Sequence, residues 1–113
     1  MDFIVKDLSN NICLITVNIS RATLKEAEKF KSLLLEKIQM GIKNVIVDLS
    51  QCEFIDSTFL GSLVVSLKKT TSNGGDLRLI GFQPGVETMF ELTRMYRVFE
   101  SFKTKEEAVN SFS

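Results

Sequence analysis

The feature that most constrains the fold is the stretch 43–69, where a short β-branched run leads through a loop into an amphipathic helix. Residues 45–47 are Val-Ile-Val, which indicates a strand buried on both faces. Asp56 is a good N-cap for a helix that begins at Ser57, because its carboxylate can accept the free N–H groups of the first turn. One apolar stripe then recurs at helical spacing: Leu60, Leu63, Val64 and Leu67. The stretch therefore places a hydroxyl where a strand ends and a helix begins.

The rest of the chain alternates strands and helices around this unit. Strands are predicted at 3–6, 12–17 and 77–80, with a short last strand at 98–99. Helices are predicted after Thr23, which forms a capping box with Glu26, from Pro84 to about 94–96, and after Thr104. The tight turn at 8–11 favours an antiparallel hairpin at the N-terminus. We therefore expect an α/β domain with a mainly parallel sheet of about four or five strands, an antiparallel N-terminal edge strand and about four helices.

Composition narrows the classes of function. The 113-residue chain has 14 basic and 14 acidic residues, so charge gives no reason to expect nucleic acid or an anionic membrane as a partner. Histidine is absent, which removes the commonest general base and transition-metal ligand. Cys13 and Cys52 lie in or beside apolar runs and are expected to be buried thiols. There is no signal-peptide pattern and no membrane-length apolar run, so we expect a cytoplasmic protein. We expect one domain over residues 1–113, without a cofactor or metal. We expect the protein to be a monomer or a weak dimer.

Three residues are candidates for chemistry near the central strand. Asp48 and Asp56 could form a carboxylate pair, but a strand-end turn and a helix cap are the better-supported roles. Ser57 has no histidine to activate it, and no known catalytic motif is present. Ser57 could instead accept a phosphate, because a helix N-terminus offers free N–H groups to an anion. Spacing alone leaves open whether Ser57 is such a site or only begins a helix.

Three segments carry a family signature. Residues 54–61 read FIDSTFLG and follow the strand VIVDLS, residues 74–81 read GGDLRLIG, and residues 84–93 read PGVETMFELT. Over nearly the whole chain, this pattern resembles the STAS-domain anti-sigma factor antagonists. The resemblance implies that Ser57, flanked by Asp56 and Thr58, is phosphorylated by an anti-sigma factor, which is an ATP-dependent serine kinase of the GHKL type. It also implies that a PP2C-type phosphatase removes the phosphate, and that the protein is a regulator without enzymatic activity.

Two positions differ from the family pattern. Phe59 stands where the family has Gly, and Ser20 stands in the loop where it has an Asp near the phosphosite. These differences motivate an alternative, a STAS scaffold that binds a protein constitutively without phosphorylation. A third reading is a binder of a nucleotide or lipid, with its pocket at the strand ends near Ser20, Asp48, Ser57 and Phe82.

Helix geometry predicts a docking strip beside Ser57. If the apolar stripe faces the sheet, a step of about 100° per residue points Thr58, Ser62, Val65 and Lys69 outward, with Phe59 and Ser66 on the flank. We therefore expect a partner protein to contact Phe59, Ser62, Val65, Ser66 and Lys69. An ordinary helix surface with scattered apolar residues is an equally supported reading.

Overall fold

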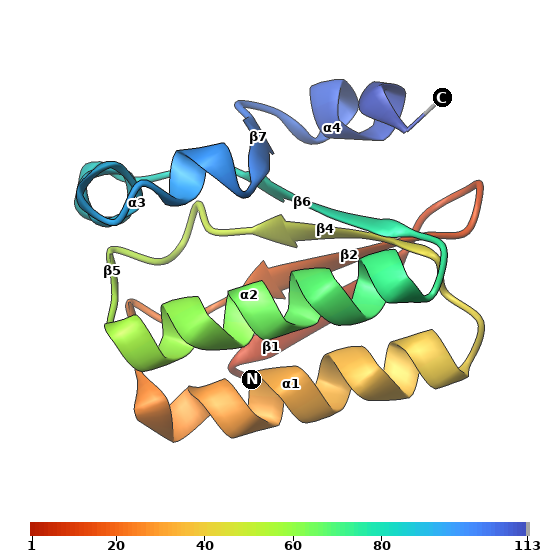
Figure 1. Cartoon of the computed structure of the whole chain (residues 1–113), viewed down its shortest axis with the longest axis horizontal. Helices are drawn as coiled ribbons and strands as arrows, with labels where there is room; N and C mark the ends of the chain where they lie inside the picture. Colours follow the sequence, from red (N-terminus) through yellow and green to blue (C-terminus); the bar gives the residue numbers. More distant parts are fainter. Residues whose placement is uncertain (113) are drawn as a thin grey trace.

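Strand β4 (Asn44–Asp48) forms the centre of the sheet, and its Val-Ile-Val segment is fully buried. The computed structural model describes residues 1–112. Within that range β4 lies third in a five-stranded sheet of order β1-β2-β4-β6-β7, in which only β1 is antiparallel to its neighbour (Figure 1). Strands β3 and β5 form a separate parallel pair. The other strands are β1 Phe3–Asp7, β2 Ile12–Val17, β3 Arg21–Ala22, β5 Phe54–Ile55, β6 Asp76–Ile80 and β7 Glu100–Phe102.

Four α-helices and one 3₁₀ turn occur within residues 1–112: α1 Leu24–Gln39, α2 Ser57–Ser72, α3 Pro84–Leu92, η1 Met95–Arg97 and α4 Lys105–Ser111. Helices α1 and α2 lie side by side on one face of the sheet, and α4 lies on the other (Figure 1). The predicted fold class, with its antiparallel edge strand and about four helices, is confirmed.

Local signals explain most of the element boundaries. Thr23 forms the predicted capping box with Glu26. Thr104 precedes α4 as predicted and forms a second capping box, with Glu107. Asn10 and Asn11 adopt positive φ in the β1–β2 turn, a conformation that asparagine tolerates better than most residues. The hairpin that places β1 at the sheet edge therefore follows from the turn chemistry.

Two expected boundaries near the C-terminus are wrong. Helix α3 ends at Leu92, short of 94–96, because Arg94 has a left-handed φ of 59° and the chain continues as the 3₁₀ turn η1. The last strand is β7, Glu100–Phe102, and not 98–99. Phe99 instead enters the core against Phe90, and its N–H donates to the Met95 carbonyl.

Two hydrophobic clusters form on opposite faces of the sheet. The larger lies under α1 and α2, and the smaller joins Ile12, Ile46, Ile80 and Ala108 under α4. Arg78 of β6 holds α4 in place, because its guanidinium lies over the Phe112 ring at 4.3 Å and donates to the Ser111 hydroxyl. Cys13 and Cys52 are buried and unpaired, as predicted.

Candidate functional site

The first turn of α2 is anchored by Asp56. Its Oδ1 accepts the N–H of Phe59 at 2.8 Å, which is the predicted N-cap. Its Oδ2 accepts the N–H of Leu24, the first residue of α1, at 3.0 Å. One carboxylate therefore fixes the starts of two helices, which lie at the same end of the molecule (Figure 1).

Ser57 and Thr58 are exposed in this first turn. The first N–H groups of an α-helix have no partner within the helix, and the dipole makes this end positive. The hydroxyl of Ser57 is thus accessible to another protein, at a position where the backbone favours a negative group.

The segment that leads into α2 is held by the loop after β2. The carbonyl of Ser20 accepts the N–H groups of Glu53 and Phe54 at 2.8 and 3.1 Å. The hydroxyl of Ser20 donates to Glu53 Oε2 at 2.6 Å. The following residues pair β3 with β5, so the structure brings the Ser20 loop beside the strand that ends just before Asp56. The Ser20 hydroxyl is committed to Glu53 within this contact.

Asp48 has a structural role in the turn after β4. Its Oδ1 accepts the N–H of Ser50 at 2.8 Å. Gly81 packs against the same turn, and a Cβ there would fall 2.9 Å from Ser50 Cβ. Asp48 is thus a strand-end turn residue and Asp56 a helix cap, which confirms the interpretation that the sequence favoured.

The predicted outward face of α2 is only partly correct. Thr58, Val65 and Lys69 are exposed, as expected. Phe59, Ser62 and Ser66 are buried, with exposed fractions of 0%, 3% and 0%, so these three cannot be surface contacts. The expectation was wrong because α2 packs against α1 as well as against the sheet. The hydroxyls of Ser62 and Ser66 bond back to the carbonyls of Phe59 and Ser62, which satisfies them inside this interface.

Phe59 is a core residue. Its ring centroid lies 5.5 Å from that of Phe30 on α1 and 6.4 Å from that of Phe3 on β1. Edge and offset contacts of this kind stabilise aromatic clusters. The large residue at the family's glycine position is therefore absorbed by the core and does not cover Ser57.

Thr58, Gly61, Val65 and Lys69 are exposed along one line of α2, which we call the α2 strip. Other exposed residues of this helix are Ser57, Lys68, Thr71 and Ser72. Sequence reasoning missed Gly61, which is exposed and where an added Cβ would have no heavy atom within 4 Å. Leu24 at the start of α1 is also exposed, with 65% of its surface accessible, although its side chain is apolar. The Thr23 capping box was the available signal, because it makes Leu24 the first helical residue, before the buried turn.

No cluster of three or more His, Cys, Asp or Glu side chains within residues 1–112 could hold a metal ion. Burial raises the pKa of Cys52, the thiol nearest the Ser20 loop, and its Sγ donates to the Phe54 carbonyl at 3.3 Å. A buried thiol with a raised pKa is a poor nucleophile.

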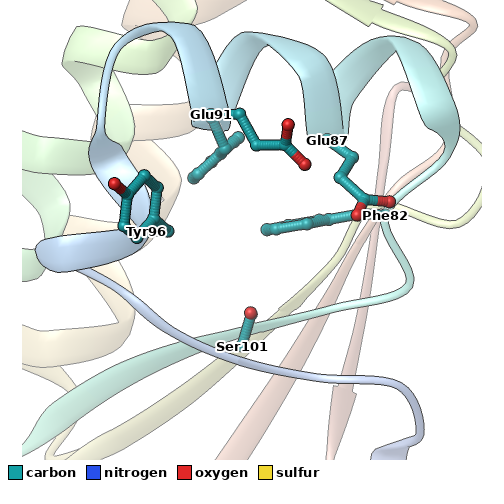
Figure 2. A pocket seen from close by; sticks show the side chains of 6 residues that line it. Phe82, Glu87, Glu91, Tyr96 and Ser101 are labelled. Atoms are coloured by element: carbon teal, nitrogen blue, oxygen red, sulfur yellow. The ribbon is translucent and has the colours of Figure 1, made fainter.

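The four residues that were expected to surround one pocket at the strand ends, Ser20, Asp48, Ser57 and Phe82, do not line a common cavity. Phe82 lines a cavity, but the other walls come from α3, η1 and β7, and Ser20, Asp48 and Ser57 do not line it (Figure 2). No helix among the described residues has the length and hydrophobicity that a membrane crossing requires.

Comparison with known proteins places this geometry in a family. The family model for the STAS domain matches residues 4–108. A protein of Thermotoga maritima named as an anti-sigma factor antagonist is 31% identical over 87 residues, which cover 76% of this chain and 77% of that protein. The anti-sigma factor antagonist BtrV of Bordetella bronchiseptica, also so named, is 26% identical over 86 residues, covering 76% and 74%. A crystal structure of an anti-sigma factor antagonist from T. maritima superimposes with a TM-score of 0.89 at 27% identity, covering 97% of this chain and 93% of that one. The chain therefore belongs to the STAS domain family.

Proposed function

We propose that this protein is an anti-sigma factor antagonist that binds an anti-sigma factor when unmodified and releases it when Ser57 is phosphorylated. The observation that carries the proposal is the exposed Ser57 hydroxyl on the first turn of α2, beside the α2 strip. The named relatives from T. maritima and B. bronchiseptica support the partner class.

The modification is a phosphoryl transfer. The Ser57 oxygen attacks the γ-phosphorus of ATP, the bond between the γ-phosphorus and the bridging oxygen breaks, and ADP leaves. The hydroxyl proton passes to a base of the kinase, since Asp56 already accepts two backbone N–H groups. ATP and Mg²⁺ belong to the GHKL-type kinase. A PP2C-type phosphatase reverses the step by adding water across the bond between phosphorus and the serine oxygen.

The switch follows from local electrostatics. A phosphoserine adds about −1.5 to −2 charges at pH 7. The free N–H groups of the first turn stabilise that charge, so α2 stays folded. Next to it, Asp56 already holds a negative charge and Gly61 and Val65 present an uncharged surface. A partner that packs on Gly61 and Val65 would have to desolvate the phosphate, and this cost would release it.

Incubation with ATP and the GHKL-type kinase of the source organism tests the proposal, with the modified residue located by mass spectrometry. We expect phosphate on Ser57 and none in Ser57→Ala, while Thr58→Ala serves as the matched control and remains a substrate. Ser57→Asp should weaken partner binding and Ser57→Ala should bind constitutively. Phosphate at another residue, or none, contradicts the proposal.

A constitutive STAS scaffold is the second candidate. One observation favours it: the loop position that holds an Asp in the family is Ser20, whose hydroxyl is occupied by Glu53. In that case Ser57→Asp would leave partner affinity unchanged. The burial of Phe59 removes the other reason for this candidate, because Phe59 cannot contact a partner directly.

A further inference from the structure

A cavity of about 510 Å³ opens beneath α3, away from Ser57. Its lining comes from the loop after β6, from α3, from η1 and from β7: Phe82, Glu87, Phe90, Glu91, Tyr96 and Ser101. This volume is within the range of small-molecule sites. Neither the α2 strip nor Asp56 contributes to it, so the cavity needs an explanation of its own.

Aromatic rings form the base and one side of the cavity. Phe82 and Phe90 pack with ring centroids 4.6 Å apart and an interplanar angle of 32°, and Phe90 is 1% exposed. Phe82 is half-buried and Tyr96 is 55% exposed, so both have ring surface available to a ligand. Figure 2 shows the Phe82 ring lying across the cavity with Tyr96 at the opposite end.

Two carboxylates form the roof. Glu87 and Glu91 project from successive turns of α3 into the space around the Phe82 ring (Figure 2). Both residues are exposed, and within residues 1–112 the structure gives neither carboxylate an ion pair. Like charges at this i,i+4 spacing repel each other and destabilise a helix. A cation between them would remove that repulsion.

The charged residues around the cavity favour a cationic ligand over an anionic one. An adjoining cavity of about 690 Å³ shares Phe82, Glu87 and Ser101 and adds Lys103 and Glu107 among its lining residues. The lining of the two spaces thus holds three acidic residues, Glu87, Glu91 and Glu107, and one basic residue, Lys103. An anion would be repelled, whereas a cation gains both the carboxylates and the faces of the aromatic rings.

We propose that this cavity binds a cationic group carried on an apolar stem, an alkylammonium or alkylguanidinium. The stem lies along Phe82 and Tyr96, and the charged head reaches Glu87 and Glu91. The proposal does not depend on phosphorylation of Ser57 or on any partner of the α2 strip.

Titration of the ¹⁵N-labelled chain, followed by amide chemical shifts, tests this proposal with n-butylammonium and n-butylguanidinium. We expect saturable shifts at Phe82, Glu87, Glu91 and Ser101. The neutral n-butanol and the anionic butyrate are matched probes and should bind at least about tenfold more weakly. Equal binding of all four probes, or no saturable binding of either cation, overturns the proposal.

Matched variants test whether cation binding depends on Glu87 and Glu91 or only on the net charge of the chain. Glu87→Gln/Glu91→Gln should weaken binding of either cation by about tenfold or more. Glu28→Gln/Glu36→Gln, which makes the same charge change on the exposed face of α1, should leave it within about twofold. Tyr96→Ala should also weaken binding, and because Tyr96 is exposed this variant should keep the wild-type fold, which its amide spectrum checks. Unchanged affinity in the Glu87/Glu91 variant contradicts the proposal.

A second arm distinguishes a free amine from a protein side chain. N-acetyl-arginine amide and N-acetyl-lysine amide carry the same head groups with a peptide backbone. Tighter binding of these blocked residues than of the butyl probes assigns the cavity to an arginine or lysine of a protein. Tighter binding of the butyl probes assigns it to a small organic cation.

Discussion

Asp56 Oδ2 accepts the backbone N–H of Leu24 at 3.0 Å, so the loop before α2 is bonded directly to the start of α1. The other oxygen caps α2 itself through the N–H of Phe59. Ser57 therefore follows a residue whose position is fixed from two directions. An exposed side chain on a rigid backbone suits recognition by another protein, because little freedom is lost on binding.

Removal of this shared cap should destabilise the fold more than removal of a single cap. A lost N-cap costs about 0.5–2 kcal/mol, and Asp56→Ala removes two such bonds, so we expect a loss of about 1–3 kcal/mol in the free energy of unfolding. Thr104→Ala, which uncaps α4 alone, is the control. Urea denaturation measures both. A smaller loss for Asp56→Ala than for Thr104→Ala would show that the second bond contributes nothing.

Phe59 should contribute to the stability of the fold and not to partner binding. Its ring is fully buried against Phe3 and Phe30, so Phe59→Ala should lower the free energy of unfolding by about 3–5 kcal/mol. Phe59→Leu keeps much of the volume and should cost less. In the folded Phe59→Leu variant, partner affinity should match the wild type. Weaker binding by that variant at unchanged stability would restore Phe59 to the docking surface.

Much of the fold could be predicted from the sequence because its local signals agree. The β-branched run at 45–47, the capping boxes at Thr23 and Thr104, and Asp56 before the apolar stripe each specify one element. The short pair β3–β5 was not predicted, because strands of two residues carry no periodicity. The shift of the last strand to β7 depends on Phe99 filling a core position, which is a tertiary effect.

The candidate site was predicted less completely, for a geometric reason. A helical wheel locates one buried stripe, but α2 contacts both the sheet and α1, so its buried arc is wider. The wheel placed Ser62 on the outward face and Ser66 on its flank because both lie away from the apolar stripe. They are buried because small hydroxyl side chains let α1 and α2 approach, and each hydroxyl bonds to its own helix.

A large side chain at Gly61 should block partner binding without destabilising the fold. A Cβ at this exposed helix position meets no heavy atom within 4 Å, and glycine is a poor helix former. Gly61→Arg should therefore raise the free energy of unfolding by up to about 1 kcal/mol. Because Gly61 lies in the α2 strip, the same variant should block the anti-sigma factor. Gln39→Arg adds the same side chain at the exposed end of α1 and should leave binding unchanged. Full binding by Gly61→Arg, measured by calorimetry, would exclude the strip as the interface.

The buried Cys13 thiol should make stability depend on pH in the alkaline range. Burial, with a smaller effect of Asp7 and against an opposing effect of Lys37, raises the pKa of Cys13 from 9.0 to about 11. Between these values the folded chain keeps a proton that the unfolded chain has lost, so the stabilisation is complete below about pH 9 and is lost as pH rises toward 11. The loss should be on the order of 2–3 kcal/mol.

Comparison with Cys13→Ala isolates this effect, because every other titrating group is common to both chains. Urea denaturation at intervals from pH 8 to pH 11 should give a free energy of unfolding that falls more steeply for the wild type than for Cys13→Ala. Cys52→Ala tests the second buried thiol, and since burial also raises the pKa of Cys52, this variant should flatten the curve as well. Parallel curves for wild type and Cys13→Ala would mean that the thiolate of Cys13 is solvated in the folded protein, contrary to its complete burial between β1 and β4.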